Sequence, residues 1–220
     1  MALLEVRNAG KVYGGPNAPV TALADVSLSV YAGEFVALVG RSGCGKSTLL
    51  NLCGAMDFPS SGEVVIDGEV TSRLTDAALT RLRREKIGFV FQSFQLLHTL
   101  TALANVELPL LLARKANSRK IAEERLRWVE MGAYADRFPH QLSGGQQQRI
   151  AIARALAQDP RLVLADEPTG NLDTATAETV LGLLRRTVDE FGVAVILATH
   201  SREGLALADR VLSLRDGRMT

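Results

Sequence analysis

Four short runs made almost entirely of apolar residues stand out along the chain, at 35–39, 87–91, 162–165 and 193–198. Continuous apolar runs of this length are typical of strands that are buried on both faces of a sheet. The stretches between them have the composition of helices. This alternation predicts an α/β fold built around a mostly parallel sheet.

Shorter apolar runs occupy the first third of the chain, at 3–6, 24–30 and 64–66, with Gly or Asp at their ends. They predict half-exposed strands. Near the end of the sequence, the run 211–214 leads into Asp216-Gly217, which is a hairpin turn signal.

The middle of the chain has a different pattern. Residues 76–86 are rich in Leu and Arg and predict an exposed helix, and residues 118–131 predict an amphipathic helix that ends at Gly132. Residues from about 93 to 155 carry little strand signal. We therefore expect a helical subdomain inserted into the sheet domain.

Composition and charge narrow the classes of protein. The chain has 220 residues, of which 47% are hydrophobic and 22% charged, so a globular fold is expected and a disordered chain is excluded. The formal net charge of +1 gives no electrostatic reason to expect nucleic acid as a partner. No apolar run approaches the roughly 18 residues of a membrane span, and no signal peptide is visible. Cys44 and Cys53 fit no metal-binding spacing, which favours a reduced, cytosolic compartment.

The segment from Gly40 to Ser47 matches the phosphate-binding pattern G-x-x-x-x-G-K-[ST] at every fixed position. It follows the buried run 35–39 and precedes an apolar helical stretch at 48–56, which is the strand–loop–helix context that this pattern requires. Backbone N–H groups of such a loop point at phosphate oxygens, Lys46 is expected to reach the β- and γ-phosphates, and Ser47 is expected to bind Mg²⁺. A chance glycine-rich turn is the alternative. The candidate nucleotide-binding residues here are Gly40, Ser42, Gly43, Cys44, Gly45, Lys46, Ser47 and Thr48.

Two carboxylates, Asp166 and Glu167, end the apolar run 162–165. Since side chains alternate along a strand, one carboxylate can hold Mg²⁺ while the other orients and deprotonates water. A polar strand end that caps the next turn is the alternative. His200 and Gln92 also follow buried runs, at the strand ends where parallel sheets bind ligands.

A second candidate anion site begins at Leu142-Ser143-Gly144-Gly145-Gln146, where Ser143 and two glycines precede a helix. Together with Gln147, Gln148 and Arg149, this segment closely resembles the signature of ATP-binding cassette (ABC) ATPases. The other family elements occur in the expected order: the phosphate loop, a Q-loop glutamine, the signature, two adjacent carboxylates, the D-loop segment 170–173 and a switch histidine.

The resemblance implies roles for individual residues. Glu167, His200 and Gln92 are expected to act in catalysis on ATP, and Ser47, Gln92 and Asp166 to hold Mg²⁺. The signature residues are expected to contact the ATP of a second copy of the chain, so that two copies close head to tail over two ATP molecules. Asp173 is expected to link the two sites, and Tyr13 to stack on adenine, although a turn role for Asp173 and a packing role for Tyr13 are the alternatives. The residues expected to contact nucleotide outside the phosphate loop are Tyr13, Ser143, Gly144, Gly145, Gln146 and Asp173.

The resemblance also implies a fold and its division. We expect a single P-loop ABC ATPase domain over residues 1–220, with an antiparallel β subdomain beside the mostly parallel core. Residues 1–92 and 156–220 are expected to form the ATP-binding core, and 93–155 the helical signature subdomain.

The segments 166–173, 89–92 and 100–106 are similar to those of the bacterial class that serves lipoprotein release and macrolide export, although Ala104 stands where this class has Glu. The resemblance implies an ATPase subunit on the cytoplasmic face of the inner membrane, bound to a separate membrane permease. The alternatives are a cell-division-type regulatory ATPase that moves no solute, and a soluble ABC ATPase acting on ribosomes or DNA.

Two further hypotheses concern chemistry. Cys44 lies in the phosphate loop, near a helix N-terminus and Lys46, so it is a candidate reactive thiol that ATP would protect; an inert loop residue is the alternative. Replacing Glu167 by Gln is expected to preserve ATP binding and nearly stop turnover.

Overall fold

The computed structural model describes residues 1–14 and 18–220. Its centre is a six-stranded sheet in the order β10-β9-β3-β8-β7-β6. Five of these strands run parallel, and β10 pairs antiparallel with β9 at one edge. The strands are β3 (Phe35–Val39), β6 (Ile87–Phe91), β7 (Leu162–Asp166), β8 (Ala194–Ala198), β9 (Arg210–Arg215) and β10 (Arg218–Met219).

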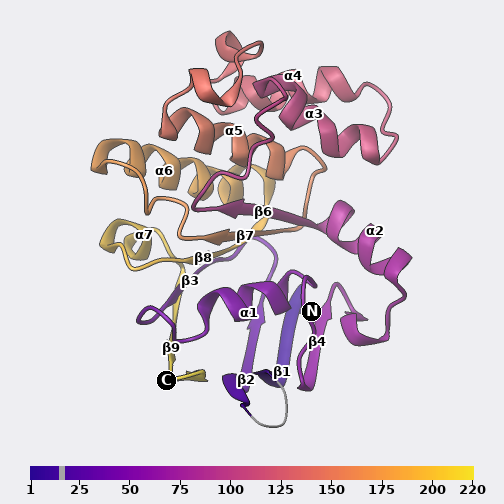
Figure 1. The fold of residues 1–220 in the computed structure, drawn as a ribbon, viewed down its shortest axis with the longest axis vertical. Coiled ribbons are helices and arrows are strands. Elements are labelled where there is room, and N and C mark those ends of the chain that lie inside the picture. The colour runs from indigo at the N-terminus through magenta and orange to yellow at the C-terminus, as the bar shows by residue number, and fades with distance from the viewer. Residues whose placement is uncertain (15–17) are drawn as a thin grey trace.

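The alternating side chains of this sheet enter two separate apolar cores. Val36, Leu38 and Ile196 face one core with helix α1 (Lys46–Cys53) and the N-terminal strands. Phe35 and Val195 face the other core with helices α5 (Gly144–Leu156) and α6 (Thr174–Phe191). The sheet is therefore covered on both faces, which explains why its strands read as continuous apolar runs. Figure 1 shows α1 below the parallel strands and α5 and α6 above them.

A second sheet, in the order β2-β1-β4-β5, is antiparallel and packs beside α1. Its strands are longer than the sequence pattern predicts. Asn8 and Asp25 have positive φ angles of 48° and 55°, and the β1–β2 register shifts between Val6 and Ala9. Such bulges interrupt the two-residue alternation, so the pattern identified only parts of these strands. The strands are β1 (Leu4–Tyr13), β2 (Val20–Val30), β4 (Ser61–Ile66) and β5 (Glu69–Val70).

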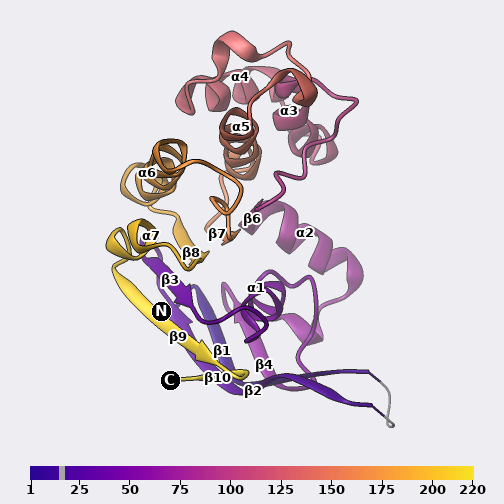
Figure 2. The same ribbon diagram turned by 60° about the vertical axis from the view of Figure 1, so that its left-hand side comes forward.

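Between β6 and β7, the described residues form helices and no strand. Hydroxyl side chains cap the N-termini of two of these helices. The Thr101 hydroxyl accepts a hydrogen bond from the Ala104 N–H, and the Ser143 hydroxyl accepts one from the Gln146 N–H. The helices are α3 (Ala102–Leu112), α4 (Ser118–Trp128) and α5, with single 3₁₀ turns at Gly132–Tyr134 and Pro139–Gln141. Figure 2 shows α3, α4 and α5 together at one end of the molecule. The expected subdomain boundary at 93–155 remains a prediction.

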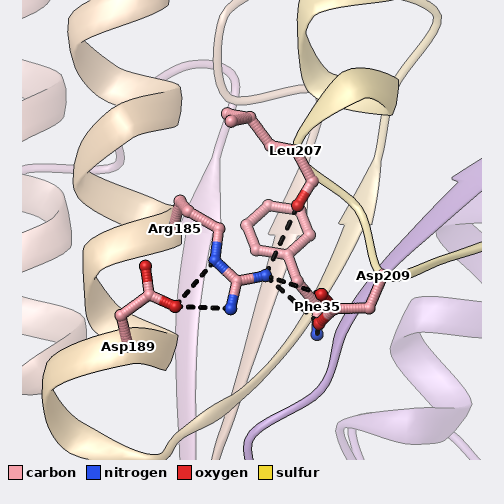
Figure 3. A network of polar contacts seen from close by, with 5 residues as sticks. All are labelled: Phe35, Arg185, Asp189, Leu207 and Asp209. Carbon is pink, nitrogen blue, oxygen red and sulfur yellow. Dashed lines mark hydrogen bonds and ion pairs between the residues drawn. The ribbon is translucent and has the colours of Figure 1, made fainter.

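Arg185 of helix α6 forms polar contacts that link this helix to the parallel sheet (Figure 3). The Arg185 guanidinium donates to Asp189 on the same helix and to both carboxylate oxygens of Asp209, which precedes β9. Asp209 in turn accepts the backbone N–H of Phe35 at 2.8 Å, and the guanidinium lies 5.7 Å from the centre of the Phe35 ring. These contacts join α6 to the beginnings of two neighbouring strands, β3 and β9.

Several predicted boundaries need correction. The helix expected at 48–56 begins at Lys46 and ends at Cys53, and the helix expected to reach 131 ends at Trp128. The run expected at 193–198 forms a strand from Ala194. Residues 210–215 form the fifth parallel strand as well as one arm of the expected hairpin.

The remaining helices are α2 (Asp76–Lys86), as predicted, the short α7 (Arg202–Ala206), and a 3₁₀ turn at Thr71–Arg73. Within the part of the chain that the structure describes, no helix combines the length and the apolar character needed to cross a membrane.

Candidate functional site: a phosphate loop beside two carboxylates

The predicted site residues meet at the carboxyl edge of the parallel sheet. Phe91, Asp166 and Ala198 occupy one row of neighbouring strands, and Leu38 of β3 lies beside Ala198. The next residues along each chain segment therefore emerge together: Gln92, Glu167, Thr199-His200, and Val39-Gly40.

The phosphate loop lies between β3 and α1. Gly45 begins α1 with a φ of 108°, and a Cβ there would lie 2.6 Å from the Ala22 carbonyl oxygen, so only glycine fits. The first-turn N–H groups of Lys46, Ser47 and Thr48 have no carbonyl partner within the helix, as at any helix start. Free N–H groups at a helix start favour binding of an anion.

The Lys46 ammonium is folded back over this loop. Its side chain is 7% exposed, and its Nζ donates to the Gly40 carbonyl oxygen at 2.9 Å. A buried ammonium that touches neutral carbonyls is only partly compensated, so a phosphate at the loop would be a favourable partner.

Cys44 lies in the same loop but faces the apolar core. Its side chain is 6% exposed and belongs to the cluster that contains Leu38 and Leu49. This burial argues against the hypothesis of an accessible, reactive thiol. Cys53 is buried too, and its burial raises the pKa of that thiol to about 12.

Glu167 follows directly after β7 at this edge. Its φ of 44° is unusual for a residue with a side chain, and its N–H donates to the Ala198 carbonyl oxygen at 2.9 Å, which holds this conformation. Glu167 Oε1 lies 3.8 Å from Lys46 Nζ and 3.6 Å from His200 Nδ1. The carboxylate, the loop lysine and the histidine are therefore within one small site. Glu167 and His200 also line an open cleft of about 200 Å³.

Three oxygen-bearing side chains expected to hold Mg²⁺ come from this region. Ser47 is exposed in the first turn of α1, Asp166 is half-buried at the end of β7, and Gln92 is exposed after β6. One carboxylate with hydroxyl and amide oxygens is a hard donor set that suits Mg²⁺ together with substrate phosphates. Within the described residues there is no cluster of three or more His, Cys, Asp or Glu side chains suited to a metal.

Tyr13 ends β1 and is 39% exposed. Its hydroxyl donates to Asp57 at 2.9 Å, and the Lys11 ammonium lies 4.9 Å from the ring centre. Burial and the Asp57 bond raise the pKa of Tyr13, while a hydrogen bond involving Thr48 lowers it. The ring therefore lies near the phosphate-loop helix.

The signature residues form the first turn of α5, against the other face of the sheet. Ser143 and Gln146 bond to each other's backbone N–H groups in a capping box. A Cβ on Gly145 would lie 2.1 Å from the Thr176 methyl, and one on Gly144 would lie 3.4 Å from Leu172, so this turn packs against the start of α6. Within one chain, the signature and phosphate-loop helices lie on opposite faces of the parallel sheet (Figure 1).

Asp173 is the N-cap of α6 and accepts the Thr176 N–H at 3.0 Å and its hydroxyl at 2.6 Å. These bonds hold the pKa of Asp173 below its ordinary value. The structure thus gives Asp173 the capping role expected of a turn residue, and its proposed link between two sites remains a prediction.

The sequence pattern does not identify two further side chains that lie near the site. Asn171 exchanges hydrogen bonds with Gln92, and the fully buried Gln148 of α5 donates to the Phe91 carbonyl oxygen at 3.2 Å. The partners are 79 and 57 residues apart in sequence. In the sequence, only their positions inside the D-loop and signature segments indicate that Asn171 and Gln148 belong near the site.

The chain matches the protein family described as ABC transporter over residues 23–170. It is 47% identical to the lipoprotein-releasing system ATP-binding protein LolD of Bordetella pertussis, over 98% of this chain and 94% of that protein. It is 46% identical to the macrolide export ATP-binding/permease protein MacB of Rhodospirillum rubrum, over 99% of this chain and 34% of that protein. The dimeric, ADP- and Pi-bound structure of the ATP-binding cassette MJ0796 of Methanocaldococcus jannaschii superposes with a TM-score of 0.91 at 45% identity, covering 98% of this chain and 96% of that one.

These similarities confirm the predicted family and fold class. They favour the transporter interpretation over the cell-division and ribosome- or DNA-directed alternatives.

Proposed function

The chain belongs to the ABC transporter family and is an ATP-hydrolysing subunit, and from that premise we propose which of its residues perform each step and what it assembles with. The observation that carries the proposal is the convergence of Lys46, Glu167 and His200 at the carboxyl edge of the sheet, with Glu167 Oε1 within 4.0 Å of both Lys46 Nζ and His200 Nδ1.

The phosphate loop binds the triphosphate. The N–H groups at the start of α1 donate to phosphate oxygens, and Lys46 exchanges its carbonyl contacts for the β- and γ-phosphates. Tyr13, which lies near Thr48, stacks on adenine. Ser47, Asp166 and Gln92 hold Mg²⁺, which neutralises charge on the β- and γ-phosphate oxygens when it is bound.

Glu167 acts on the attacking water. Its carboxylate accepts a proton as the water oxygen bonds to the γ-phosphorus, and the bond from that phosphorus to the β–γ bridging oxygen breaks. Lys46 stabilises the negative charge that develops on the phosphate oxygens. His200 Nδ1, at 3.6 Å from Glu167 Oε1, orients the carboxylate and the γ-phosphate.

The test is Glu167→Gln. The amide keeps the size and hydrogen bonding of the side chain but cannot take the proton, so turnover should fall by about 10²- to 10⁴-fold while ATP binding persists. Phosphate release and equilibrium binding of ATP would be measured on the same preparations. Glu203→Gln is the matched control, because Glu203 lines the same cleft from α7 but forms no hydrogen bond or ion pair with Lys46. Turnover within a few-fold of the unsubstituted chain would refute the assignment of Glu167.

We propose that two copies form the working ATPase. Ser143, Gly144, Gly145 and Gln146 lie on the opposite face of the sheet from the phosphate loop, so a γ-phosphate bound by the loop needs the signature of a second copy. A head-to-tail dimer makes that contact twice. The dimeric state of the similar cassette MJ0796 supports this arrangement.

We propose that a separate membrane permease binds at a groove of about 600 Å³ between α2, β6, α3 and α5. Its lining is largely apolar and includes Ile87, Phe89 and Leu112, and Leu112 is 67% exposed. Three arginines also line it and no acidic side chain does among the described residues, so the complementary segment is apolar and bears a carboxylate. The groove borders β6, which leads directly to Gln92. The lining arginines are Arg83, Arg84 and Arg154.

This assembly places the chain on the cytoplasmic face of the inner membrane, held there by its partner. The transported substrate class that the similar proteins suggest is a lipoprotein or a macrolide. Nucleic acid is not proposed as a partner.

A further inference from the structure

Two residues far apart in sequence form a two-point contact at the edge of the site. Gln92 follows β6, and Asn171 lies in the turn between β7 and α6. The Gln92 Nε2 donates to Asn171 Oδ1 at 3.2 Å, and the Asn171 Nδ2 donates to the Gln92 backbone oxygen at 3.4 Å. One side chain thus binds both the amide group and the main chain of the other.

This pair of contacts fixes which way round the Gln92 amide lies. The Gln92 backbone oxygen can only accept, so the NH₂ end of Asn171 must face it. The oxygen end of Asn171 is then the one that faces the Gln92 amide, and it can only be met by an NH₂ group. Gln92 Oε1 is therefore directed away from Asn171, and no donor among the described residues bonds to it.

The neighbouring glycine makes room for this arrangement. A Cβ on Gly170 would lie 2.7 Å from Gln92 Nε2 and 3.1 Å from Gln92 Cδ. Those distances are below normal van der Waals contact, so any larger residue at Gly170 would displace the amide. The Gln92 side chain therefore packs directly on the turn that carries Asn171.

We infer that Asn171 is a positioning residue for the Mg²⁺ site: it holds the Gln92 amide with its oxygen presented to the metal. The inference rests on the proposed function, in which Gln92 is a metal ligand. Hydrogen bonds behind a metal ligand fix its orientation, and their loss typically lowers metal affinity by about 10- to 100-fold. Without Asn171, the amide is free to turn its NH₂ end to the site, which repels a cation.

The experiment measures binding of a non-hydrolysable ATP analogue by calorimetry, once with EDTA and once with Mg²⁺. The ratio of the two dissociation constants is the gain in affinity that the metal provides. Asn171→Ala should reduce this gain by about tenfold and leave binding in EDTA unchanged. Gln92→Ala should reduce the gain at least as much, and the double variant should be no worse than Gln92→Ala, because Asn171 acts only through Gln92.

A conservative replacement provides the decisive comparison. Gln92→Glu presents an oxygen whichever way its end group is turned, so it does not need to be oriented. In the Gln92→Glu background, Asn171→Ala should therefore leave the metal-dependent gain unchanged. If Asn171 instead had a general structural role, Asn171→Ala would still reduce the metal-dependent gain in the Gln92→Glu background.

Gly170→Ala tests the same geometry without touching Asn171. Its methyl group should displace the Gln92 amide and reduce the gain in the same way, with the fold intact by circular dichroism. Gly182→Ala is the matched control, because a Cβ at Gly182 in α6 meets nothing within 4 Å. That control should bind the analogue as the unsubstituted chain does.

Two outcomes overturn the inference and leave the proposed function standing. One is a full metal-dependent gain in Asn171→Ala while Gln92→Ala loses it. The other is a loss in Asn171→Ala that persists in the Gln92→Glu background or appears equally in EDTA. If Gln92→Ala keeps the full gain, the proposed role of Gln92 in metal binding is wrong and the inference falls with it.

Discussion

Glu167 has a strained backbone conformation, with a φ of 44°, and it is the residue that we propose as the general base. A non-glycine residue at a positive φ costs of order 1–3 kcal/mol, and it persists only where the surroundings impose it. Here the Glu167 N–H is bound to Ala198 and the Glu167 carbonyl accepts the Gly170 N–H at 3.1 Å. These bonds turn the carboxylate out of the strand direction of Asp166 and toward Lys46 and His200. The backbone strain therefore suits the division of roles that we propose for the two adjacent carboxylates.

Tyr13 allows a prediction at the same scale. If its ring stacks on adenine, Tyr13→Ala should weaken ATP binding by about tenfold, because stacking of a base on an aromatic ring contributes roughly 1–3 kcal/mol. Tyr13→Phe should keep most of the affinity, since it keeps the ring and loses only the hydroxyl group, with its bond to Asp57. Equilibrium titration with ATP would compare them. Equal weakening in both variants would show that the Asp57 bond, and not the ring, supports binding.

At the scale of elements, the contacts of Arg185 show how a helix is fixed to the sheet that carries the site. Asp209 bonds to the first residue of β3 and to α6, so the phosphate loop at the other end of β3 is anchored through this carboxylate. The Phe35 N–H is the largest cause that lowers the pKa of Asp209, followed by Arg185. A carboxylate with a lowered pKa stabilises the fold above its unfolded pKa, and that contribution is lost as the pH falls through the folded value.

We predict that Asp209→Asn lowers the free energy of unfolding by about 1 kcal/mol at pH 7, a figure kept small because the carboxylate is half exposed. The difference between the two proteins should shrink below about pH 4, where the unfolded carboxylate is protonated, and vanish at lower pH. Urea unfolding at several pH values measures it. Asp216→Asn is the control, since that carboxylate is 91% exposed and should change stability little at any pH. A difference that stays constant down to pH 2.5 would argue against a charge effect.

At the scale of the whole molecule, the separation of the phosphate-loop helix from the signature helix bears on how two copies assemble. The phosphate-loop helix shares a core with the antiparallel sheet, and the signature helix shares one with α3, α4 and α6. Covering both faces of a parallel sheet stabilises the fold, and it also keeps Lys46 and Ser143 of one chain on different faces. An ATP that needs both must lie between two chains.

Subunit mixing tests this arrangement. Lys46→Ala and Ser143→Arg should each be inactive alone, because every homodimer then has two defective sites. Mixed and allowed to exchange, roughly half of the dimers become heterodimers, in which one site carries both defects and the other is intact. ATP hydrolysis should then return to about a quarter of the unsubstituted rate if the sites work independently.

Strict coupling between the two sites of a dimer would suppress the recovery of activity in the mixed sample, so a labelling experiment is the control. In a Cys44→Ser background, a chain with Ser143→Cys and Lys46→Ala is mixed with a chain whose Lys46 is intact, and a thiol-reactive ATP analogue is added. The label should appear on the chain that cannot bind ATP itself. Absence of the label there, with no rescue in the mixed sample, would rule out a shared site.

The sequence alone determined the parts of this protein that depend on neighbours along the chain. The four buried strands, the strand–loop–helix setting of residues 40–47 and the position of two carboxylates at a strand end were correctly predicted, because glycine spacing, strand alternation and apolar runs are local properties. The roles of these residues toward ATP and Mg²⁺ stay predictions. The bulged β1 and β2 strands were found only in part, since a bulge cancels the alternation that identifies a strand.

Only the tertiary structure decided which distant residues meet. It placed residues 210–215 beside β3 as a fifth parallel strand, buried Cys44 in the core, and brought Asn171 onto Gln92 across 79 positions of sequence. Pairing of strands and of side chains at such separations follows from how all elements pack together, and an amide's orientation follows from its partners. The local sequence pattern predicts neither the long-range pairing nor the orientation of an amide. The contacts of Asn171 and Gln148 near the site are therefore seen only in the folded structure, where their segments meet at one edge of the sheet.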